Sequence, residues 1–307
     1  MSRKVALVGI GKIARDQHIP SIAADDAWEL AATVSRNASV DGVEHFSTID
    51  ELLAKRPDIE VISLSIPPQP RFDYARKALE AGRHVILEKP PGQSLAECYT
   101  LERLAKQKGV TLFATWHSRY ADGVPAAKTW LATRTIKRFQ ITWKEDVRRW
   151  HPGQEWIWEP GGLGVFDPGI NALSIMTEIL PYSVHLADAV LEYPENRDTP
   201  IAAELNFANP DAAPMNAVFD WRQEGPQTWD IDIETNDGSM KLSAGGAQVS
   251  VDGQMVVEGS DHEYANLYNR MTKLLDTNHS DVDLAPMIHV CDACALGKRK
   301  TVAPFQF

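Results

Sequence analysis

A glycine-rich turn near the N-terminus has the residue types and the spacing of a phosphate-binding site. It reads Gly9-x-Gly11-x-x-Ala14 and follows Lys4–Val8, which predicts a short buried strand. The first glycine permits a tight turn, the second lets a pyrophosphate approach the backbone, and the third position needs a small residue. A helix that begins here directs its free N–H groups at the phosphates. This context predicts a dinucleotide site, the alternative being a glycine turn in another kind of α/β protein.

The pair Ser35-Arg36 bears on which dinucleotide is bound. It follows Trp28–Val34, the second predicted strand, and this position faces the adenosine ribose in a dinucleotide-binding unit. Neither residue is acidic, as NAD binding would favour, whereas the Arg36 guanidinium suits the 2′-phosphate of NADP. We expect NADP to be used at least as efficiently as NAD, unless Arg36 is an ordinary solvated residue.

Strands and helices alternate through the first part of the chain. Further strands are predicted at 59–66, 84–87 and 111–116, and helices at 49–55, 72–81 and 95–108. The β-branched run at 59–66 is typical of a strand buried on both faces. The alternation predicts a parallel, doubly wound sheet of the Rossmann type, in a dinucleotide-binding domain of residues 1–118.

The second part of the chain has longer, amphipathic strands. They are predicted at 136–143, 185–192, 200–207, 215–222, 229–235 and 240–243, with turn signals such as Asn236-Asp237-Gly238 between them. Helices at 124–133, 171–178 and 263–277 should cover one face. We expect an α+β substrate domain of residues 119–307 with an open, largely antiparallel sheet, so that the whole chain is of the α/β class.

The composition excludes several classes of protein. The chain has 307 residues, 44% of them hydrophobic, and a net charge of −11, which argues against nucleic-acid and membrane partners. No apolar run approaches the roughly 18 residues of a membrane span. The apolar run Val5–Ile10 belongs to the first strand, so we expect no signal peptide and a cytoplasmic protein.

The three cysteines do not make a disulfide framework, because their number is odd. Cys291 and Cys294 form a CxxC pair, but the surrounding pattern at 283–296 is helical and no second pair exists. We expect helix cysteines with a structural role, and no metal site.

Three motifs, taken together and in this order, resemble the glucose–fructose oxidoreductase and inositol dehydrogenase family, Gfo/Idh/MocA. They are Gly9–Ala14, Glu88-Lys89-Pro90 and Gly161-Gly162-x-x-x-x-Asp167-x-Gly169, and the resemblance covers the whole chain. Within the family, the chain is similar to bacterial aldose 1-dehydrogenases that act on L-arabinose or D-galactose. The stretches that carry this likeness are Gly11–His18, Ala114–Arg119 and Trp143–Gly153.

The resemblance implies an NAD(P)-dependent oxidation of a sugar hydroxyl. It places Lys89 beside the nicotinamide and the reacting carbinol, where an ammonium stabilises a developing alkoxide as an oxyanion-hole donor does. A cis peptide bond before Pro90 is a family feature. The expected cofactor-binding residues are Gly9, Ile10, Gly11, Lys12, Ile13, Ser35, Arg36, Pro67, Glu88 and Lys89.

The chain departs from the family where a histidine usually serves as the catalytic base. The family pattern Asp-x-Gly-x-His reads Asp167-Pro168-Gly169-Ile170-Asn171 here, and asparagine cannot accept a proton near neutral pH. Similar aldose dehydrogenases share this pair. We expect Asp167 to be the base, with Glu145 or His151 in reserve and Asn171 on the same helix face. Alternatively, Asp167 only caps a helix that starts near Pro168.

The segment Trp143–Trp158 has the residue types of a sugar site. It holds four of the nine tryptophans together with Glu145 and His151. Sugars present polar rims and apolar C–H faces, which suit carboxylates and indoles, although some of these indoles could simply be buried in an interface. The resemblance assigns Glu145 and His151 to sugar hydroxyls, and His117, Trp150 and Trp229 to the walls of the site.

The sequence therefore predicts an enzyme that oxidises C1 of an aldopyranose to the aldonolactone by hydride transfer to NAD(P). One alternative is an inositol or polyol dehydrogenase of the same family. Another is a non-enzymatic dinucleotide-binding sensor or repressor, against which the presence of Lys89 and Asp167 counts. The family resemblance also favours a homodimer formed through an exposed sheet face.

Overall fold

The chain folds into two compact units, in a computed structural model that describes residues 2–306. Unit 1 comprises Met1–His117 and Tyr264–Asp283, and unit 2 comprises Ser118–Glu263 and Leu284–Phe307. Each unit is thus built from two stretches that are far apart in the sequence. The functional domain boundaries predicted above, 1–118 and 119–307, stay a prediction.

Unit 1 contains a six-stranded sheet in the order β3-β2-β1-β4-β5-β6, in which every pair of neighbours is parallel. The strands are β1 (Arg3–Val8), β2 (Trp28–Val34), β3 (Glu44–Phe46), β4 (Val61–Leu64), β5 (His84–Leu87) and β6 (Leu112–Ala114). The strand order reverses between β1 and β4. In open α/β sheets, ligands bind beyond the carboxyl ends of the strands at such a point.

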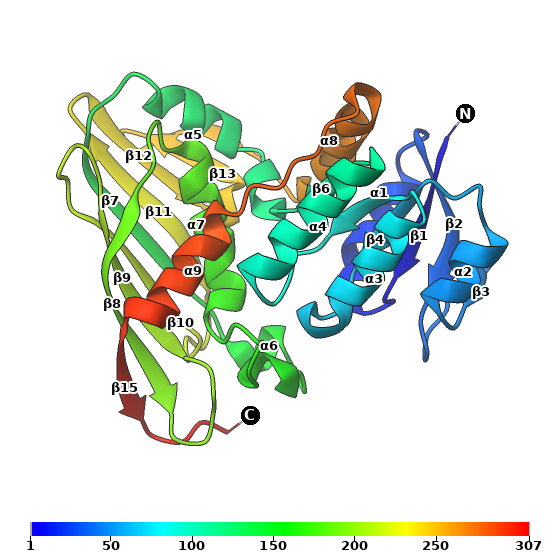
Figure 1. Cartoon of the computed structure of the whole chain (residues 1–307). Coiled ribbons are helices and arrows are strands. Elements are labelled where there is room, and N and C mark those ends of the chain that lie inside the picture. Colours follow the sequence, from blue (N-terminus) through cyan, green and yellow to red (C-terminus); the bar gives the residue numbers. More distant parts are fainter. Residues whose placement is uncertain (1, 307) are drawn as a thin grey trace. The chain divides into compact units, whose positions relative to one another are not determined.

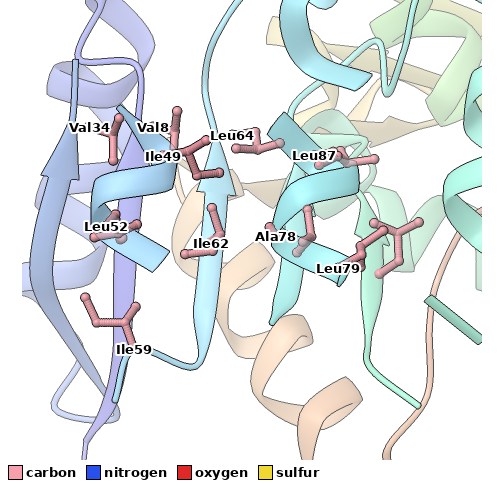
Figure 2. Packing of buried hydrophobic residues seen from close by; sticks show 14 of the residues in the cluster. Val8, Val34, Ile49, Leu52, Ile59, Ile62, Leu64, Ala78, Leu79 and Leu87 are labelled. Atoms are coloured by element: carbon pink, nitrogen blue, oxygen red, sulfur yellow. The ribbon is translucent and has the colours of Figure 1, made fainter. Parts of the chain in front are cut away.

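Helices and strands of unit 1 share a continuous apolar core. The helices are α1 (Ile19–Ala23), α2 (Ile49–Lys55), α3 (Pro68–Glu80), α4 (Leu95–Lys108) and α8 (Glu263–Thr277). Figure 2 shows Leu52 of α2 beside Ile62 of β4, and Leu79 of α3 on the side of the sheet that carries Leu87 of β5; all four belong to one buried cluster. Burial of such side chains contributes about 1.5–3 kcal/mol each. This core fixes the strand ends that carry the predicted cofactor residues.

Unit 2 contains a nine-stranded sheet in the order β14-β13-β12-β11-β7-β10-β9-β8-β15. The strands are β7 (Ile136–Lys144), β8 (His185–Pro194), β9 (Ala202–Ala208), β10 (Met215–Asp220), β11 (Thr228–Thr235), β12 (Gly238–Ser243), β13 (Gln248–Val251), β14 (Gln254–Glu258) and β15 (Lys298–Val302). The pairs β7·β10 and β8·β15 are parallel, and the others are antiparallel. The expected largely antiparallel sheet is confirmed.

The helices of unit 2 are α5 (Val124–Leu131), α6 (Val147–Trp150), α7 (Phe166–Ile179) and α9 (Ala285–Leu296), and α5, α7 and α9 lie along one face of the sheet (Figure 1). The prediction that the helix at 263–277 also covers this sheet was wrong. That helix is α8, whose Tyr268 packs against Trp28 and hydrogen-bonds His18, so it belongs to unit 1. The buried aromatic side chains of α8, Tyr264 and Tyr268, pack within unit 1.

Three further observations concern the described residues 2–306. None of their helices combines the length and apolar character needed to cross a membrane. They contain no group of three or more metal-ligating side chains with the geometry to hold an ion. None of their three cysteines is in a disulfide bond, and desolvation raises the pKa of the Cys291 and Cys294 thiols, which keeps them protonated at neutral pH.

Candidate active site

The glycine-rich loop after β1 has the backbone geometry that its sequence predicts. Gly9 has a φ of +91°, and a Cβ atom at this position would lie 2.7 Å from Ile66 Cγ2, so only glycine fits. Beside Gly11, no described atom other than those of Gly11 and its two neighbours in the chain lies within 4 Å of the corresponding point, which leaves its backbone open to a ligand. The helix that follows contains a π-helical turn, η1 (Ala14–His18), a feature frequent at functional sites.

The carboxyl end of β2 lies next to this loop, because the Gly9 N–H donates to the Val34 carbonyl at 2.9 Å. Ser35 follows directly, and its N–H donates to the Phe46 carbonyl of β3 at 3.1 Å. Arg36 is exposed. Its guanidinium is therefore available to an anionic group beyond the end of β2.

Lys89 lies in a loop that begins immediately after β5. The Lys89–Pro90 peptide bond is cis, as the family resemblance implied. The buried guanidinium of Arg71, from α3, donates hydrogen bonds to the carbonyl oxygens of Glu88, Pro90 and Ile66. One side chain thus holds together the loops after β4 and β5. Lys89 itself is half-buried, so its backbone is fixed while its side chain retains access to solvent.

The carboxylate of Glu88 is the centre of a buried hydrogen-bond network. Its Oε1 lies 3.0 Å from His18 Nε2 and accepts the Tyr264 hydroxyl at 2.9 Å, and its Oε2 accepts the Lys89 N–H at 3.1 Å. Burial alone would raise the pKa of Glu88, but the hydrogen bonds and charge of His18, with the Tyr264 hydroxyl, lower it to about 2. Glu88 is therefore ionised at neutral pH and fixes the backbone next to Lys89.

Helix α8 supplies two tyrosines to this network. Tyr268 contacts the other ring nitrogen of His18 at 2.8 Å, and Tyr264 stacks on His117 with ring centroids 5.4 Å apart. The sequence analysis missed His18 and both tyrosines. His18 lies within a stretch that carries the family likeness, but its partners come from a helix late in the sequence, which no local pattern connects to it.

In unit 2, the carboxylate of Glu145 is held by two indoles. Glu145 follows β7 and is only 5% exposed. Its Oε1 accepts the indole N–H of Trp221 at 3.2 Å, and its Oε2 accepts that of Trp229 at 3.0 Å. Trp221 was not predicted, because a tryptophan at the end of a strand has no pattern that distinguishes it from a core residue.

His151 lies between two buried carboxylates. Its Nε2 is 3.5 Å from Asp167 Oδ2 and 3.9 Å from Glu145 Oε1, and its ring is 5.3 Å from the ring of Trp221. Asp167 is 4% exposed. The structure thus brings together three titratable side chains, from α7, from the end of β7 and from the segment after α6.

The helix that carries Asp167 begins earlier than predicted. It starts at Phe166, with Val165 at the N-cap, so Asp167 lies inside the first turn and does not cap the helix through its side chain. The turn forms early because Gly164 adopts a φ of +54° and its carbonyl accepts the Asp167 N–H at 2.8 Å. Asn171 is half-buried one turn later, on the same helix face as Asp167, as expected.

The tryptophans of the Trp143–Trp158 segment divide into two kinds. Trp143 and Trp158 are buried in the core of unit 2. Trp150 is half-buried, 5.4 Å from the ring of Trp229, and its indole N–H donates to Gln227 at 3.3 Å. Trp150 and Trp229 therefore form an aromatic surface beside Glu145, whereas the alternative of simple burial holds for Trp143 and Trp158; the fourth tryptophan of the segment, Trp156, is half-buried.

The predicted residues thus fall into two groups. Those of unit 1 lie in the loops after β1, β2, β4 and β5, and at the start of the segment after β6; they are Gly9, Ile10, Gly11, Lys12, Ile13, Ser35, Arg36, Pro67, Glu88, Lys89 and His117. Those of unit 2 are gathered around Glu145 and α7; they are Glu145, Trp150, His151, Asp167, Asn171 and Trp229.

Comparisons with known proteins decide the family. The oxidoreductase family with an NAD-binding Rossmann fold, Gfo/Idh/MocA, matches residues 3–115. Galactose 1-dehydrogenase from Pseudomonas fluorescens is 42% identical over 305 residues, which cover 98% of each chain. The chain belongs to the Gfo/Idh/MocA oxidoreductase family. The family resemblance carried by its motifs is confirmed, and so is the Rossmann fold of unit 1.

Solved structures share this fold along all or nearly all of the chain. The crystal structure of a D-galactose-1-dehydrogenase from Rhizobium etli matches with a TM-score of 0.96 and 55% sequence identity, and covers 100% of this chain and 99% of its own. A 3-ketoreductase from Actinomadura kijaniata, solved with NADP, matches with a TM-score of 0.84 at 16% identity over 98% of this chain. The second likeness shows the shared fold alone.

The residues of unit 1 fit the dinucleotide that the family binds. A Cβ atom would collide with the chain at Gly9, whereas the backbone beside Gly11 is open, which is the arrangement that a pyrophosphate needs. The exposed Arg36 lies beyond β2, where the ribose end of the cofactor is bound in Rossmann folds. When bound, the nicotinamide supplies the acceptor for a hydride.

Proposed function

We propose that this protein is an NAD(P)-dependent sugar dehydrogenase that oxidises C1 of an aldopyranose of the D-galactose or L-arabinose type to the aldonolactone. The observation that carries the proposal is the cluster in unit 2, where the indoles of Trp221 and Trp229 hold Glu145 while His151 and Asp167 lie alongside. Indoles suit the C–H faces of a sugar, and the carboxylates suit its hydroxyls.

The relatives support this choice of substrate class. The Pseudomonas fluorescens protein named galactose 1-dehydrogenase aligns over 98% of the chain, and the Rhizobium etli D-galactose-1-dehydrogenase over all of it. Glu145, His151 and Asp167 lie in or beside the segment that first indicated the aldose 1-dehydrogenases. The proposal therefore rests on a local cluster and on likeness over the full length.

Asp167 takes the proton of the C1 hydroxyl in this proposal. Both oxygens of Glu145 already accept indole hydrogen bonds, which makes that carboxylate less available as a base. Asn171 orients the same hydroxyl from one turn later, and His151 holds the Asp167 carboxylate from 3.5 Å away. The ammonium of Lys89 stabilises the negative charge that develops on the C1 oxygen.

Steady-state kinetics with L-arabinose, D-galactose, D-xylose and myo-inositol, each with NADP and with NAD, tests the proposal. We expect the highest kcat/KM with D-galactose or L-arabinose, and NADP at least as good as NAD. A preference for myo-inositol would instead indicate a polyol dehydrogenase. Tight NADPH binding without turnover of any of these compounds would indicate a dinucleotide sensor.

A further inference from the structure

The segment after β15 packs against the part of unit 2 that carries His151. Phe305 is 8% exposed, and its ring centroid lies 5.5 Å from that of Trp158, at the end of the η3 turn (Glu155–Trp158). The guanidinium of Arg148, in α6, lies over the same ring at 4.5 Å from its centroid. Phe305 therefore contacts both ends of residues 147–158, which we call the substrate segment.

The backbone around Phe305 is fixed as well. The Asn196 side chain accepts the Phe305 N–H at 2.9 Å and donates to the Phe305 carbonyl at 2.9 Å. Arg148 Nη2 donates to the carbonyl of Gln306 at 3.1 Å, so α6 is tied to the trace that follows β15 (Figure 1). The Asn196 amide thus fixes the Phe305 backbone, and the contacts with Trp158 and Arg148 hold its ring.

A chain of ring contacts connects Phe305 to the sugar-binding cluster. Trp158 lies edge-on to Trp221, with centroids 5.2 Å apart, and Trp221 donates to Glu145 and packs against His151. A shift of Trp158 would therefore move the indole that positions Glu145. Close-packed interiors transmit such shifts, because few voids exist to absorb them.

We propose that Phe305 is a positioning residue for sugar binding, which holds the substrate segment in place through Trp158 and Arg148. The proposal rests on the sugar dehydrogenase function proposed above. In this proposal Phe305 acts on the site through its contacts with Trp158 and Arg148. Its effect is to keep Trp158, Trp221 and Glu145 in one arrangement. The site is then preorganised, so sugar binding does not include the free-energy cost of ordering these side chains.

The test compares Phe305→Ala with a matched control, Phe207→Ala. Phe207 is a similarly buried ring of unit 2, 5% exposed, which packs against His289 away from the substrate segment. We expect Phe305→Ala to raise the KM for the sugar and to lower kcat/KM about 10- to 100-fold, with the KM for NADP unchanged. Phe305→Tyr, which keeps the ring, should restore sugar binding, and Phe207→Ala should leave the sugar KM unchanged.

Hydrogen–deuterium exchange decides the inference independently of the substrate. Peptides that cover 147–158 should exchange faster in Phe305→Ala than in the wild type and in Phe207→Ala. Asn196→Ala, which removes the two backbone hydrogen bonds, should act in the same direction if Phe305→Ala does not fold. Unchanged exchange in 147–158 would overturn the inference. A wild type that oxidises no sugar would refute the proposed function instead, and the exchange result would still stand.

Discussion

At the scale of single residues, the two carboxylates of the cluster in unit 2, Glu145 and Asp167, have different partners and therefore different expected roles. Each oxygen of Glu145 accepts an indole N–H, from Trp221 or from Trp229, whereas Asp167 faces His151. We expect Asp167→Asn, which keeps the shape and removes the basic oxygen, to lower kcat at least 100-fold, the lower range for general-base catalysis. Asn171→Ala should cost less and act partly on KM. A fully active Asp167→Asn enzyme would exclude Asp167 as the base.

The ammonium of Lys89 acts on charge in the transition state. Because Arg71 and Glu88 hold the backbone around it, removing the Lys89 side chain should leave the loop folded. We expect Lys89→Ala to lower kcat about 10²- to 10³-fold, the range for losing one pre-organised donor. The variant should still bind NADPH, as measured by fluorescence titration. Near-normal turnover would show that the charge at this position is not needed.

Arg36 should determine how well NADP is bound. A charge-assisted contact to the 2′-phosphate contributes roughly 1.5–3 kcal/mol, so Arg36→Ala should raise the KM for NADP about ten- to a hundredfold. NAD lacks this phosphate, and its KM should change little. Initial-rate measurements with both cofactors make the comparison within one variant. An equal rise for NAD and NADP would mean that Arg36 does not read the phosphate.

At the scale of elements, the Glu88 network connects three parts of unit 1: η1 through His18, the loop after β5, and α8 through Tyr264. The pKa of Glu88 falls from 4.5 to about 2 on folding, so its ionised form stabilises the folded state above about pH 4.5. That stabilisation should be lost as the pH falls from 4.5 toward 2.

The measurement is urea unfolding of the wild type and of Glu88→Gln between pH 7 and pH 3. At pH 7 we expect the variant to be less stable by about 1–3 kcal/mol, because His18 and Tyr264 lose a charged partner. The difference between the two proteins should shrink as the pH falls below 4.5. A difference that stays constant over the whole range would contradict the lowered pKa.

Helix boundaries were predicted well where side chains mark them. Helix α4 was predicted at 95–108 and forms there, because Ser94 caps its first turn and Gly109 ends it with a left-handed φ of +66°. Helix α7 has no such mark. Its start depends on the backbone turn at Gly164, which packs against Thr199 and Pro200 from a distant loop. A single sequence does not display a contact of that range.

In the candidate site, too, residues in local motifs could be predicted from the sequence, whereas residues that depend on distant contacts could not. Glu145, His151 and Asp167 could be chosen from the sequence, because they lie in motifs that resemble the family and its aldose dehydrogenases. Trp221 and His18 could not, because each acts through a partner that is distant in the sequence. Strands β13, β14 and β15 were also missed, since they are short and lack a clear apolar alternation, and β14 and β15 are exposed edge strands.

At the scale of the whole molecule, the proposed site should select a stereochemical series of sugars. L-Arabinopyranose and D-galactopyranose share the configuration at C2, C3 and C4 and differ only by a hydroxymethyl group on C5. We expect kcat/KM to be similar for both and for 6-deoxygalactose. D-Glucose, with the C4 hydroxyl inverted, should be worse by about 1–3 kcal/mol, because a buried polar group stays unpaired. Glucose turnover equal to that of galactose would refute recognition by hydroxyl configuration.

The dimer expected from the family resemblance and the cytoplasmic location expected from the sequence stay predictions at this scale. The first can be measured by light scattering on the purified protein, and we expect about twice the mass of 34.1 kDa. The sheet of unit 2 has helices along one face, and the other face carries charged strand residues such as Arg138 and Glu234, which pair at 3.1 Å. Such a polar face could be buried only against one of complementary charge.

The division of unit 1 into two stretches has a consequence for how the protein is made. A ribosome translates Met1–His117 first, but Tyr264 and Tyr268 emerge only after almost all of unit 2. Until then His18 and Trp28 lack the helix that covers them. The Rossmann sheet of the nascent chain therefore lacks helix α8 while the strands of unit 2 are being synthesised. Its apolar surface is exposed during this interval, and this is when chaperones would bind it.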